Sequence, residues 1–249
     1  MSYAILTVAS QKEGKAMQVL EIYQSKQGEG IWTGQPSVFV RFCGCPLRCR
    51  FCDSAYARRS AGEDDSVFGA FLAPDEIAGR VLLLDLPHVV LTGGEPMMSP
   101  KLVALTKLLK EYDYQITIET SGIFFQPVAC DLMSISPKLR NTVPLDGDLA
   151  VIQEHDRERS KPEIVQQLML RYNYQLKFVV DTKDDLYEID DYLSYLHGIV
   201  PNRILLMSQA IDVETMHRKA TWIEPFCNSR GYRYCPRMQL VWYGNKRRT

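Results

Sequence analysis

Short apolar runs alternate with helix-length amphipathic segments along most of this chain, and this alternation limits its fold more than any other feature. Strands that alternate with helical patterns are typical of a parallel sheet whose connections are helices. Each run is short enough for a buried strand, and most are followed by a segment with helical spacing of its apolar residues. The expected strands are residues 19–23, 38–43, 88–92, 115–119, 132–136, 175–180 and 203–207. The expected helices are residues 74–84, 99–112, 161–172, 182–196 and 212–231.

The number of strands separates an open sheet from a closed one. A closed eight-stranded barrel takes about 250 residues, which is the length of this chain of 249 residues. The sequence, however, predicts only about six parallel strands once the first expected strand is set aside as peripheral. We therefore predict an α/β fold, a partial (open) TIM-like barrel with outer helices, in a single domain over residues 17–249. Residues 1–16 are a polar leader that we expect to lie outside it. Residues 57–72 and 140–160 interrupt the alternation, and we expect inserted loops there.

Net charge narrows the classes of partner. The chain carries 29 Lys and Arg against 30 Asp and Glu, a net charge of −1, which disfavours nucleic-acid binding through a basic field. No apolar stretch approaches the roughly 18 residues that a membrane-spanning helix needs. The N-terminus lacks the pattern of a secretory signal. We expect a cytoplasmic protein that binds neither nucleic acid nor membrane.

Three cysteines fall within one short segment, Cys45-Pro-Leu-Arg-Cys49-Arg-Phe-Cys52. Thiolates are soft ligands for iron–sulfur clusters or zinc, and an electron-carrying [4Fe–4S] cluster takes four of them. Three thiolates at this spacing can hold three corners of such a cube and leave its fourth iron without a protein ligand. The segment therefore predicts a cluster at which something else binds iron.

The other four cysteines do not complete a conventional metal site. Cys43 is too close to Cys45 to serve the same cube easily, and Cys130, Cys227 and Cys235 stand singly. Structural zinc usually takes two pairs of ligands, and the sequence has neither a second cysteine pair nor a closely spaced histidine pair. An odd total of seven cysteines disfavours a disulfide framework. Zinc, or unconnected buried thiols, are the less favoured alternatives.

Polar and glycine-rich motifs follow three successive expected strands, at the end where parallel α/β folds gather their chemistry. Glycines let the backbone approach a ligand closely, Glu119 offers an acceptor to ribose hydroxyls, and the Ser136 hydroxyl with the Lys138 ammonium suits a carboxylate. Each motif alone is equally compatible with a turn or a helix cap, but their recurrence predicts a site for a charged small molecule. The motifs are Thr92-Gly93-Gly94-Glu95-Pro96, Glu119-Thr120-Ser121-Gly122 and Ser136-Pro137-Lys138.

Two groups nearer the N-terminus add to this site. Gln27 and Glu29, in Gln27-Gly28-Glu29-Gly30, offer donors and acceptors that match an amino-pyrimidinone edge, and Arg41 offers a fork to a carboxylate. The alternative is a glycine turn beside a surface ion pair. Asp53 and Ser54 directly follow the last clustered cysteine, and their hard oxygens suit magnesium or a helix cap.

The spacing Cys45-x3-Cys49-x2-Cys52, with Gly93-Gly94-Glu95-Pro96, resembles the radical S-adenosylmethionine superfamily. The wider set of motifs resembles one family within it, the 7-carboxy-7-deazaguanine synthases, from about residue 17 to the last residue. The more specific motifs are Tyr23-x3-Gln27-Gly28-Glu29-Gly30, Cys52-Asp53-Ser54, Glu119-Thr120-Ser121-Gly122, Ser136-Pro137-Lys138 and Trp242-Tyr243-Gly244-Asn245-Lys246-Arg247.

This resemblance implies a carbon–nitrogen lyase that converts 6-carboxy-5,6,7,8-tetrahydropterin to 7-carboxy-7-deazaguanine with loss of ammonia, in queuosine and deazapurine biosynthesis. It implies a [4Fe–4S] cluster, S-adenosylmethionine on the fourth iron, and Mg²⁺. It also implies a homodimer and an electron donor such as flavodoxin or ferredoxin. The alternatives are a glycyl-radical activating enzyme, which shares the cysteine spacing, and a non-catalytic iron–sulfur binding protein.

The resemblance also assigns residues. One departure is Gln239, which stands where relatives often carry histidine, so a histidine contact to substrate is not implied. Ser54 stands where relatives often carry threonine and is expected to bind magnesium. The cluster ligands would be Cys45, Cys49 and Cys52; the S-adenosylmethionine contacts Phe51, Cys52, Asp53, Gly94, Ser136, Pro137, Lys138 and Gln209; and the substrate contacts Lys26, Gln27, Gly28, Glu29, Arg41, Thr92 and the terminal carboxylate of Thr249.

Overall fold

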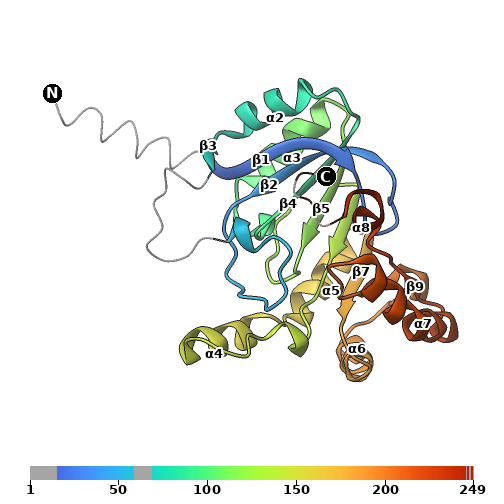
Figure 1. Cartoon of the computed structure of the whole chain (residues 1–249). Helices are drawn as coiled ribbons and strands as arrows, with labels where there is room; N and C mark the ends of the chain where they lie inside the picture. Colours follow the sequence, from blue (N-terminus) through green and yellow to red (C-terminus); the bar gives the residue numbers. More distant parts are fainter. Residues whose placement is uncertain (1–15, 59–68, 245, 247, 249) are drawn as a thin grey trace.

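A computed structural model describes residues 16–58, 69–244, 246 and 248. Nearly all of the expected leader, and the expected substrate contact at Thr249, lie outside the described residues. The described strands form one sheet in the order β3-β1-β2-β4-β5-β6-β7-β8-β9 (Figure 1). The strands are β1 (Met17–Lys26), β2 (Pro36–Phe42), β3 (Ala70–Leu72), β4 (His88–Gly93), β5 (Gln115–Thr120), β6 (Leu132–Ile135), β7 (Tyr174–Val180), β8 (Ile204–Ser208) and β9 (Arg233–Tyr234).

The sheet is parallel except at one edge. Strands β2, β4, β5, β6, β7, β8 and β9 pair in parallel, whereas β1 pairs antiparallel with both β2 and β3. Within the described residues no ladder joins β3 to β9, so the sheet does not close. The predicted α/β partial barrel is confirmed, with β1 as its peripheral strand. The two-residue strand β9 adds one parallel neighbour that was not expected.

Helices lie along the outside of the sheet and connect most of its parallel strands, whereas residues 121–131 join β5 to β6 without a helix (Figure 1). Their starts follow local chemistry: Pro74 opens α2, and the Asp212 carboxylate accepts the N–H of Thr215 at 2.7 Å to cap α7. Gly231, at φ +70°, ends α7 in the left-handed conformation that glycine adopts without strain. The helices are α2 (Pro74–Leu82), α3 (Leu102–Glu111), α4 (Leu149–Glu158), α5 (Pro162–Arg171), α6 (Asp184–Ser194), α7 (Val213–Arg230) and α8 (Met238–Tyr243).

The expectation of a loop over residues 140–160 is wrong, because most of this segment is helical. A single 3-10 turn, Arg140–Thr142, precedes α4, and the Asp148 carboxylate caps that helix by accepting the N–H of Ala150 at 2.8 Å. Of the residues of α4 only His155 is buried, so the helix lacks the apolar stripe by which amphipathic helices are recognised. In the other insertion, the described residues contain β3.

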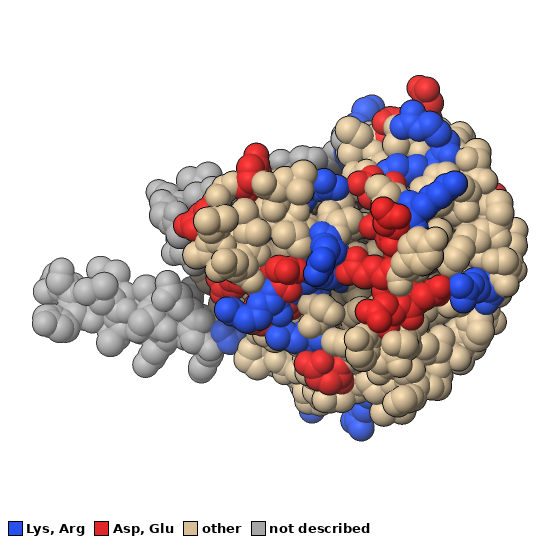
Figure 2. Space-filling model, turned by 90° about the horizontal axis from the view of Figure 1, so that it is seen from below, with Lys and Arg blue, Asp and Glu red and all other residues tan. Residues whose placement is uncertain are grey.

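The core is built from the inward faces of the helices and from strands that are buried on both sides. All five residues of β8 are buried, as are the first five of β4, which is typical of a parallel sheet covered by helices. No helix within the described ranges is long and apolar enough to cross a bilayer. On the face seen in Figure 2, Lys and Arg side chains are interspersed with Asp and Glu among the described residues.

His88 lies in this core and not in a site, as its place at the start of a buried strand predicts. The side chain is fully buried, with Nδ1 2.7 Å from the Ser37 hydroxyl and Nε2 2.8 Å from the Thr117 hydroxyl. Burial lowers the pKa of His88 from 6.5 to about 4. The folded protein therefore disfavours the imidazolium, whereas the unfolded chain does not.

This shift predicts a pH-dependent stability. Below pH 6.5 the unfolded chain takes up a proton that folded His88 refuses down to about pH 4, so stability falls as pH falls through that window. Between pH 7 and pH 5 we expect His88 to account for about 2 kcal/mol of lost unfolding free energy. The unfolding free energy can be measured with urea at both pH values. Its difference between pH 7 and pH 5 should be smaller for His88→Gln than for the parent. Substitution of the exposed His197 by Gln should leave the difference unchanged.

Candidate active site

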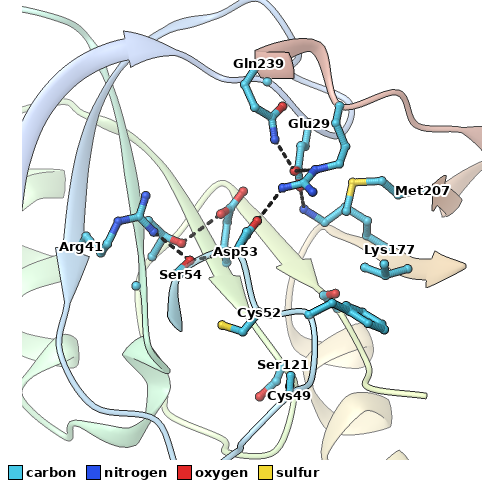
Figure 3. A pocket seen from close by; sticks show the side chains of 18 of the residues that line it. Glu29, Arg41, Cys49, Cys52, Asp53, Ser54, Ser121, Lys177, Met207 and Gln239 are labelled. Atoms are coloured by element: carbon cyan, nitrogen blue, oxygen red, sulfur yellow. Dashed lines mark hydrogen bonds and ion pairs between the residues drawn. The ribbon is translucent and has the colours of Figure 1, made fainter. Parts of the chain in front are cut away.

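A cavity of about 520 Å³ opens at the carboxyl ends of the parallel strands (Figure 3). It brings together every site residue expected from the sequence that lies within the described part of the chain, from three strands and from the five segments that follow β1, β2, β4, β6 and β8. The residues expected around cluster and cofactor that line it are Cys45, Cys49, Phe51, Cys52, Asp53, Ser54, Gly94, Ser136, Pro137, Lys138 and Gln209. The expected substrate contacts that line it are Lys26, Gln27, Gly28, Glu29, Arg41 and Thr92.

The cysteine loop (residues 43–54) leaves the end of β2 and borders this cavity. Cys45, Cys49 and Cys52 are partly exposed, whereas Cys43 is buried. Burial raises the pKa of the Cys45 thiol to about 12 and also raises the pKa values of Cys49 and Cys52, so these thiols would give up protons on binding iron.

Cys45, Cys49 and Cys52 all border one cavity. In a cube of iron and sulfide each thiolate binds a different iron. Three cysteines around one cavity therefore suit a [4Fe–4S] group.

Two glycines let the cysteine loop lie directly against the end of β4. The N–H of Gly94 donates to the Phe42 carbonyl at 2.9 Å, and the N–H of Glu95 donates to the Gly44 carbonyl at 2.8 Å. A Cβ atom at position 94 would lie 1.8 Å from the Gly44 oxygen, so any side chain there would push the loop away. Gly93 has φ +131°, and a Cβ atom there would lie 2.3 Å from the Phe42 oxygen. The glycine pair therefore sets the position of the cysteine loop.

Glu95 of the same motif has a structural role. Its side chain is only 2% exposed and accepts hydrogen bonds from the Thr120 hydroxyl at 2.7 Å and the Ser121 N–H at 2.8 Å. It also accepts the N–H of Met97 at 3.0 Å. These bonds join the ends of β4 and β5, and Glu95 does not line the cavity.

Helix α4 supports the cysteine loop from outside. His155, 1% exposed, accepts the N–H of Arg48 on Nδ1 at 3.0 Å, and its Nε2 lies 3.2 Å from the Thr142 hydroxyl. The Thr142 carbonyl accepts the N–H of Arg50 at 2.8 Å. Burial lowers the pKa of His155 to about 4, so the ring is neutral and Nδ1 can accept. The insertion thus fixes the backbone between Cys45 and Cys52.

At the other end of the cavity, a buried ionic group surrounds Glu29. Its carboxylate accepts from Lys177, from the Gln239 amide at 2.6 Å and from Arg237 Nε at 3.3 Å (Figure 3). Burial alone would raise the pKa of Glu29, but the charges of Lys177 and Arg237 lower it to about 2. Glu29 is therefore an ionised acceptor, which suits the N–H groups of an amino-pyrimidinone. Gln239, the residue at which this chain was expected to depart from the family pattern, contacts this carboxylate.

Glu119 holds two further expected substrate contacts in place. The Gln27 amide donates to Glu119 Oε1 at 3.2 Å, and the Thr92 hydroxyl donates to Oε2 at 3.0 Å. Lys26 lies with its ammonium 5.7 Å from the centroid of the Trp242 ring, which brings the C-terminal segment against this end of the cavity. These side chains form a polar wall opposite the cysteine loop.

Arg41 and the pair Asp53–Ser54 lie between the two ends. Arg41 donates to Glu21 at 2.8 Å, to the Tyr23 hydroxyl at 3.1 Å and to the Ser54 hydroxyl at 3.3 Å. Ser54 donates to Asp53 Oδ1 at 2.9 Å. Two hard oxygens and a guanidinium fork therefore meet at one place in the cavity.

The third motif and Gln209 lie on the remaining side. Lys138 Nζ donates to the carbonyl and the hydroxyl of Ser136 at 2.8 and 2.9 Å. The Gln209 carbonyl accepts from Lys219 at 2.7 Å, and Lys219 also pairs with Asp181. An ammonium and a hydroxyl held this close are suited to a carboxylate.

Two residues important for this geometry were missed by the sequence reasoning. Lys177 lies on β7, where period-two alternation gives Gln175, Lys177 and Val179 the same face. A charged residue within a mostly apolar buried strand was a usable signal. Arg237 follows the short strand β9 and carried no periodic signal. Its position depends on the return of the chain from α7 to the cavity.

Comparison with known proteins agrees with this geometry. The Radical SAM superfamily pattern matches residues 39–148. A 7-carboxy-7-deazaguanine synthase from Rhodopirellula baltica is 39% identical over 93% of this chain and 88% of its own length, and one from Halobacterium salinarum is 33% identical over 95% and 94%. A crystal structure of QueE from Escherichia coli shares the fold, with a TM-score of 0.67 at 24% identity over 92% of this chain and 97% of that chain. This chain belongs to the 7-carboxy-7-deazaguanine synthase family of radical S-adenosylmethionine enzymes.

Proposed function

We propose that this chain converts 6-carboxy-5,6,7,8-tetrahydropterin to 7-carboxy-7-deazaguanine and ammonia, the carbon–nitrogen lyase reaction of deazapurine and queuosine biosynthesis. The observation that supports it most is one cavity lined both by the cysteine loop and by side chains that match a pterin carboxylate. Substrate and products balance without an external oxidant, because they differ only by the ammonia released.

The cluster and S-adenosylmethionine would be held on the side of the cysteine loop. Cys45, Cys49 and Cys52 would bind three irons, and the cofactor's amino and carboxylate groups would bind the fourth. When bound and reduced, this pair would supply the radical chemistry for removal of a hydrogen atom from C6 of the pterin. Ser136 and Lys138 would hold the cofactor carboxylate. The further contacts proposed are the backbone of Gly94 and the side chains of Phe51, Asp53, Pro137 and Gln209.

The pterin would lie against the opposite wall. Ionised Glu29 would accept N–H groups of the amino-pyrimidinone, and the Gln27 and Thr92 side chains, held by Glu119, would complete that edge. Arg41 would hold the substrate carboxylate with its guanidinium fork. Lys26, Gly28 and the carboxylate of Thr249 complete the proposed substrate contacts, Thr249 from outside the described residues. Orientation of C6 toward the cofactor is the catalytic contribution that these residues would make.

The assay uses reconstituted, reduced protein with S-adenosylmethionine and the carboxypterin under anaerobic conditions. We expect 7-carboxy-7-deazaguanine and ammonia in equal amounts, measured by chromatography and mass spectrometry. Cleavage of S-adenosylmethionine without a deazaguanine product would sink this proposal and favour a glycyl-radical activating enzyme. An intact cluster that never cleaves the cofactor would favour a non-catalytic iron–sulfur protein.

We also propose that Mg²⁺ binds at Ser54 together with the substrate carboxylate. Magnesium takes few protein ligands, and the Ser54 hydroxyl and Asp53 carboxylate offer two oxygens 2.9 Å apart. Arg41 Nη1, 3.3 Å from the Ser54 hydroxyl, repels a bare cation, so an anionic substrate must be present to bring both together.

Magnesium removal tests this site. Ser54→Ala should lose the response to Mg²⁺ and retain about a tenth of the activity at saturating metal, because one ligand to the shared ion is gone. Ser54→Thr keeps the hydroxyl and should keep the response. Turnover rates across a magnesium titration of chelator-treated enzyme provide the measurement. A Mg²⁺ response in Ser54→Ala equal to that of the parent would contradict the assignment.

His155 should affect how firmly the cluster is held. His155→Leu leaves the buried Arg48 N–H without its acceptor, which costs about 1–3 kcal/mol, so we expect cluster loss to a chelator to become about tenfold faster. Visible absorbance and bound iron report that rate without any assay of turnover. Gln153→Leu, on the exposed face of the same helix, is the matched control. Equal rates for the two variants would show that α4 does not support the loop.

Further proposals concern organisation and partners. The sheet runs unbroken from β3 to β9, which supports one domain from residue 17 onward. The resemblance supports a homodimer and a flavodoxin or ferredoxin as electron donor, and an oxygen-sensitive cluster supports a cytoplasmic location. Sedimentation of the holoenzyme and reduction of its cluster by purified flavodoxin or ferredoxin would test the first two.

A further inference from the structure

Arg237 lies between the two ends of the cavity and contacts both. Its Nη2 is 2.7 Å from Asp53 Oδ2, in the cysteine loop, and its Nε is 3.3 Å from Glu29 Oε1, on the pterin wall. Nη1 donates to the Ala210 carbonyl at 2.7 Å. The dashed lines that connect Asp53 with Glu29 in Figure 3 follow this path. One guanidinium thus bridges the residues proposed to bind two different ligands.

The surroundings of Arg237 hold it firmly, whereas the Asp53 carboxylate is mostly exposed and is held by Arg237 on Oδ2 and by the adjacent Ser54 hydroxyl on Oδ1. The Arg237 side chain is 12% exposed, and its own N–H donates to Met216 Sδ at 3.3 Å. The next residue, Met238, donates its N–H to the Gly28 carbonyl at 3.0 Å. Asp53 is 61% exposed at its side chain. The fixed member of the ion pair is therefore the arginine, and it orients a carboxylate directly after Cys52.

The contacts of Glu29 show how a bound pterin would act on this bridge. Both Glu29 oxygens already accept hydrogen bonds: Lys177 on Oε2, and Gln239 and Arg237 on Oε1. The Arg237 contact is the longer of the two on Oε1, at 3.3 Å against 2.6 Å. A substrate N–H that binds Glu29 replaces this longer contact most easily. Arg237 then keeps its hydrogen bond to the Ala210 carbonyl, and Asp53 becomes the one carboxylate that it contacts among those described here.

We infer that Arg237 is a positioning residue that couples the binding of S-adenosylmethionine to the binding of the pterin or deazaguanine. The inference rests on the proposed function, since it requires those two ligands at the two ends of the cavity. A filled pterin subsite fixes Asp53 and with it the cysteine loop, so each ligand tightens the other by the same factor. Lysine at this position keeps the charge but cannot reach three acceptors with one ammonium.

Binding to the holoenzyme with an oxidised cluster, which does not turn over, tests this inference. The dissociation constant of S-adenosylmethionine is measured without and with saturating 7-carboxy-7-deazaguanine, and the converse pair is measured as well. For the parent we expect at least about a fivefold tightening in both directions. We call the dissociation constant without the second ligand, divided by that with it, the coupling ratio. For Arg237→Lys we expect a coupling ratio near one, with cluster absorbance and thermal unfolding close to those of the parent.

Two further variants keep the test decisive. Asp53→Asn removes the charge at the exposed end of the bridge without disturbing the buried end, so it should also give a ratio near one. Adding it to Arg237→Lys should change nothing more, because the two side chains act as one unit. Arg50→Lys is the matched control: Arg50 ties the cysteine loop to Asp181 at 3.0 Å but does not reach Glu29, so it should retain the coupling even where affinity falls.

The outcomes separate the coupling from the proposed function. A parent ratio of one, or a parent-like ratio in both Arg237→Lys and Asp53→Asn, overturns the coupling while turnover to the deazaguanine stands. Loss of the ratio in Arg50→Lys as well would show that any anchor of the loop suffices, which also overturns a specific role for Arg237. A parent enzyme that neither binds nor forms the deazaguanine overturns both proposals.

Discussion

Cys49→Ala is expected to abolish cluster assembly and every activity that depends on it. Two thiolates cannot replace three around a cube that already lacks a protein ligand on its fourth iron. Iron and sulfide per chain after anaerobic reconstitution should fall to the level of the buffer blank, and S-adenosylmethionine cleavage should fall below detection. The same result is expected for Cys45→Ala and Cys52→Ala.

Cys43→Ala is the matched control, because this cysteine lies two residues away in the same segment. Its side chain is 8% exposed and packs in the core, so we expect a stability loss of about 1 kcal/mol and a normal iron content. Failure of Cys43→Ala to assemble a cluster, with Cys45→Ala still able to do so, would reverse the assignment of the two thiols. Far-ultraviolet circular dichroism of each variant excludes unfolding as the cause.

Lys177→Met should be the most damaging change at the pterin end. It leaves Glu29 buried without its nearest cation, and breaking a buried pair in this way costs about 3–5 kcal/mol. Arg237 and the hydrogen bond from Gln239 would then oppose the effect of burial on the Glu29 pKa, and we expect that pKa to rise from about 2 toward its ordinary 4.5. We expect kcat/KM for the carboxypterin to fall at least about a hundredfold, with a larger deficit at acidic pH.

The sign of this pH dependence follows from the Glu29 pKa. In the parent, Glu29 is ionised above about pH 2, so its contribution to stability is complete above pH 4.5 and is lost only as pH falls toward 2. The parent should therefore show no loss of activity from Glu29 between pH 5 and pH 8. Rate profiles over this range, measured for both proteins, provide the comparison.

The double variant Glu29→Gln/Lys177→Met separates stability from binding. Removing both charges leaves neither Glu29 nor Lys177 as an unpaired ion. We therefore expect the unfolding free energy, measured with urea, to recover most of what Lys177→Met loses. Carboxypterin binding should stay weak, because the ionised acceptor is absent. Lys110→Met, which removes an ion pair with Asp131 outside the cavity, should leave kcat/KM unchanged. Recovery of normal carboxypterin binding in the double variant would contradict the role proposed for Glu29.

Residues with local signals could be predicted from the sequence. The alternation of strands and helices, the cysteine spacing and the motifs after β4, β5 and β6 depend on neighbours within a few positions, and the structure brings the described members of these motifs to one end of the sheet. Glu95 shows the limit of this reasoning. Its motif was correctly placed at the strand end, but the sequence could not show that the carboxylate points into the protein and joins β4 to β5.

Residues whose role depends on distant partners could not be predicted. Helix α4 looked like a loop because it buries one side chain only, and that side chain, His155, is buried by contact with a loop about a hundred positions earlier. Arg237 and Gln239 meet Glu29 across more than two hundred positions. No periodicity within a short window contains such contacts.

The sequence by itself determined the class of fold and the three-thiol loop, because hydrophobic periodicity and ligand spacing are local properties of the chain, and its motifs carried the resemblance to the family. Only the tertiary structure decided which side chains surround Glu29 and set its charge. Glu29 is an ionised acceptor because Lys177 and Arg237 lie beside it, and a buried carboxylate without such partners would have a raised pKa. Lys177 on β7 and Arg237 in the segment after β9 are far from Glu29 in the sequence, so only the folded sheet brings these cations to it.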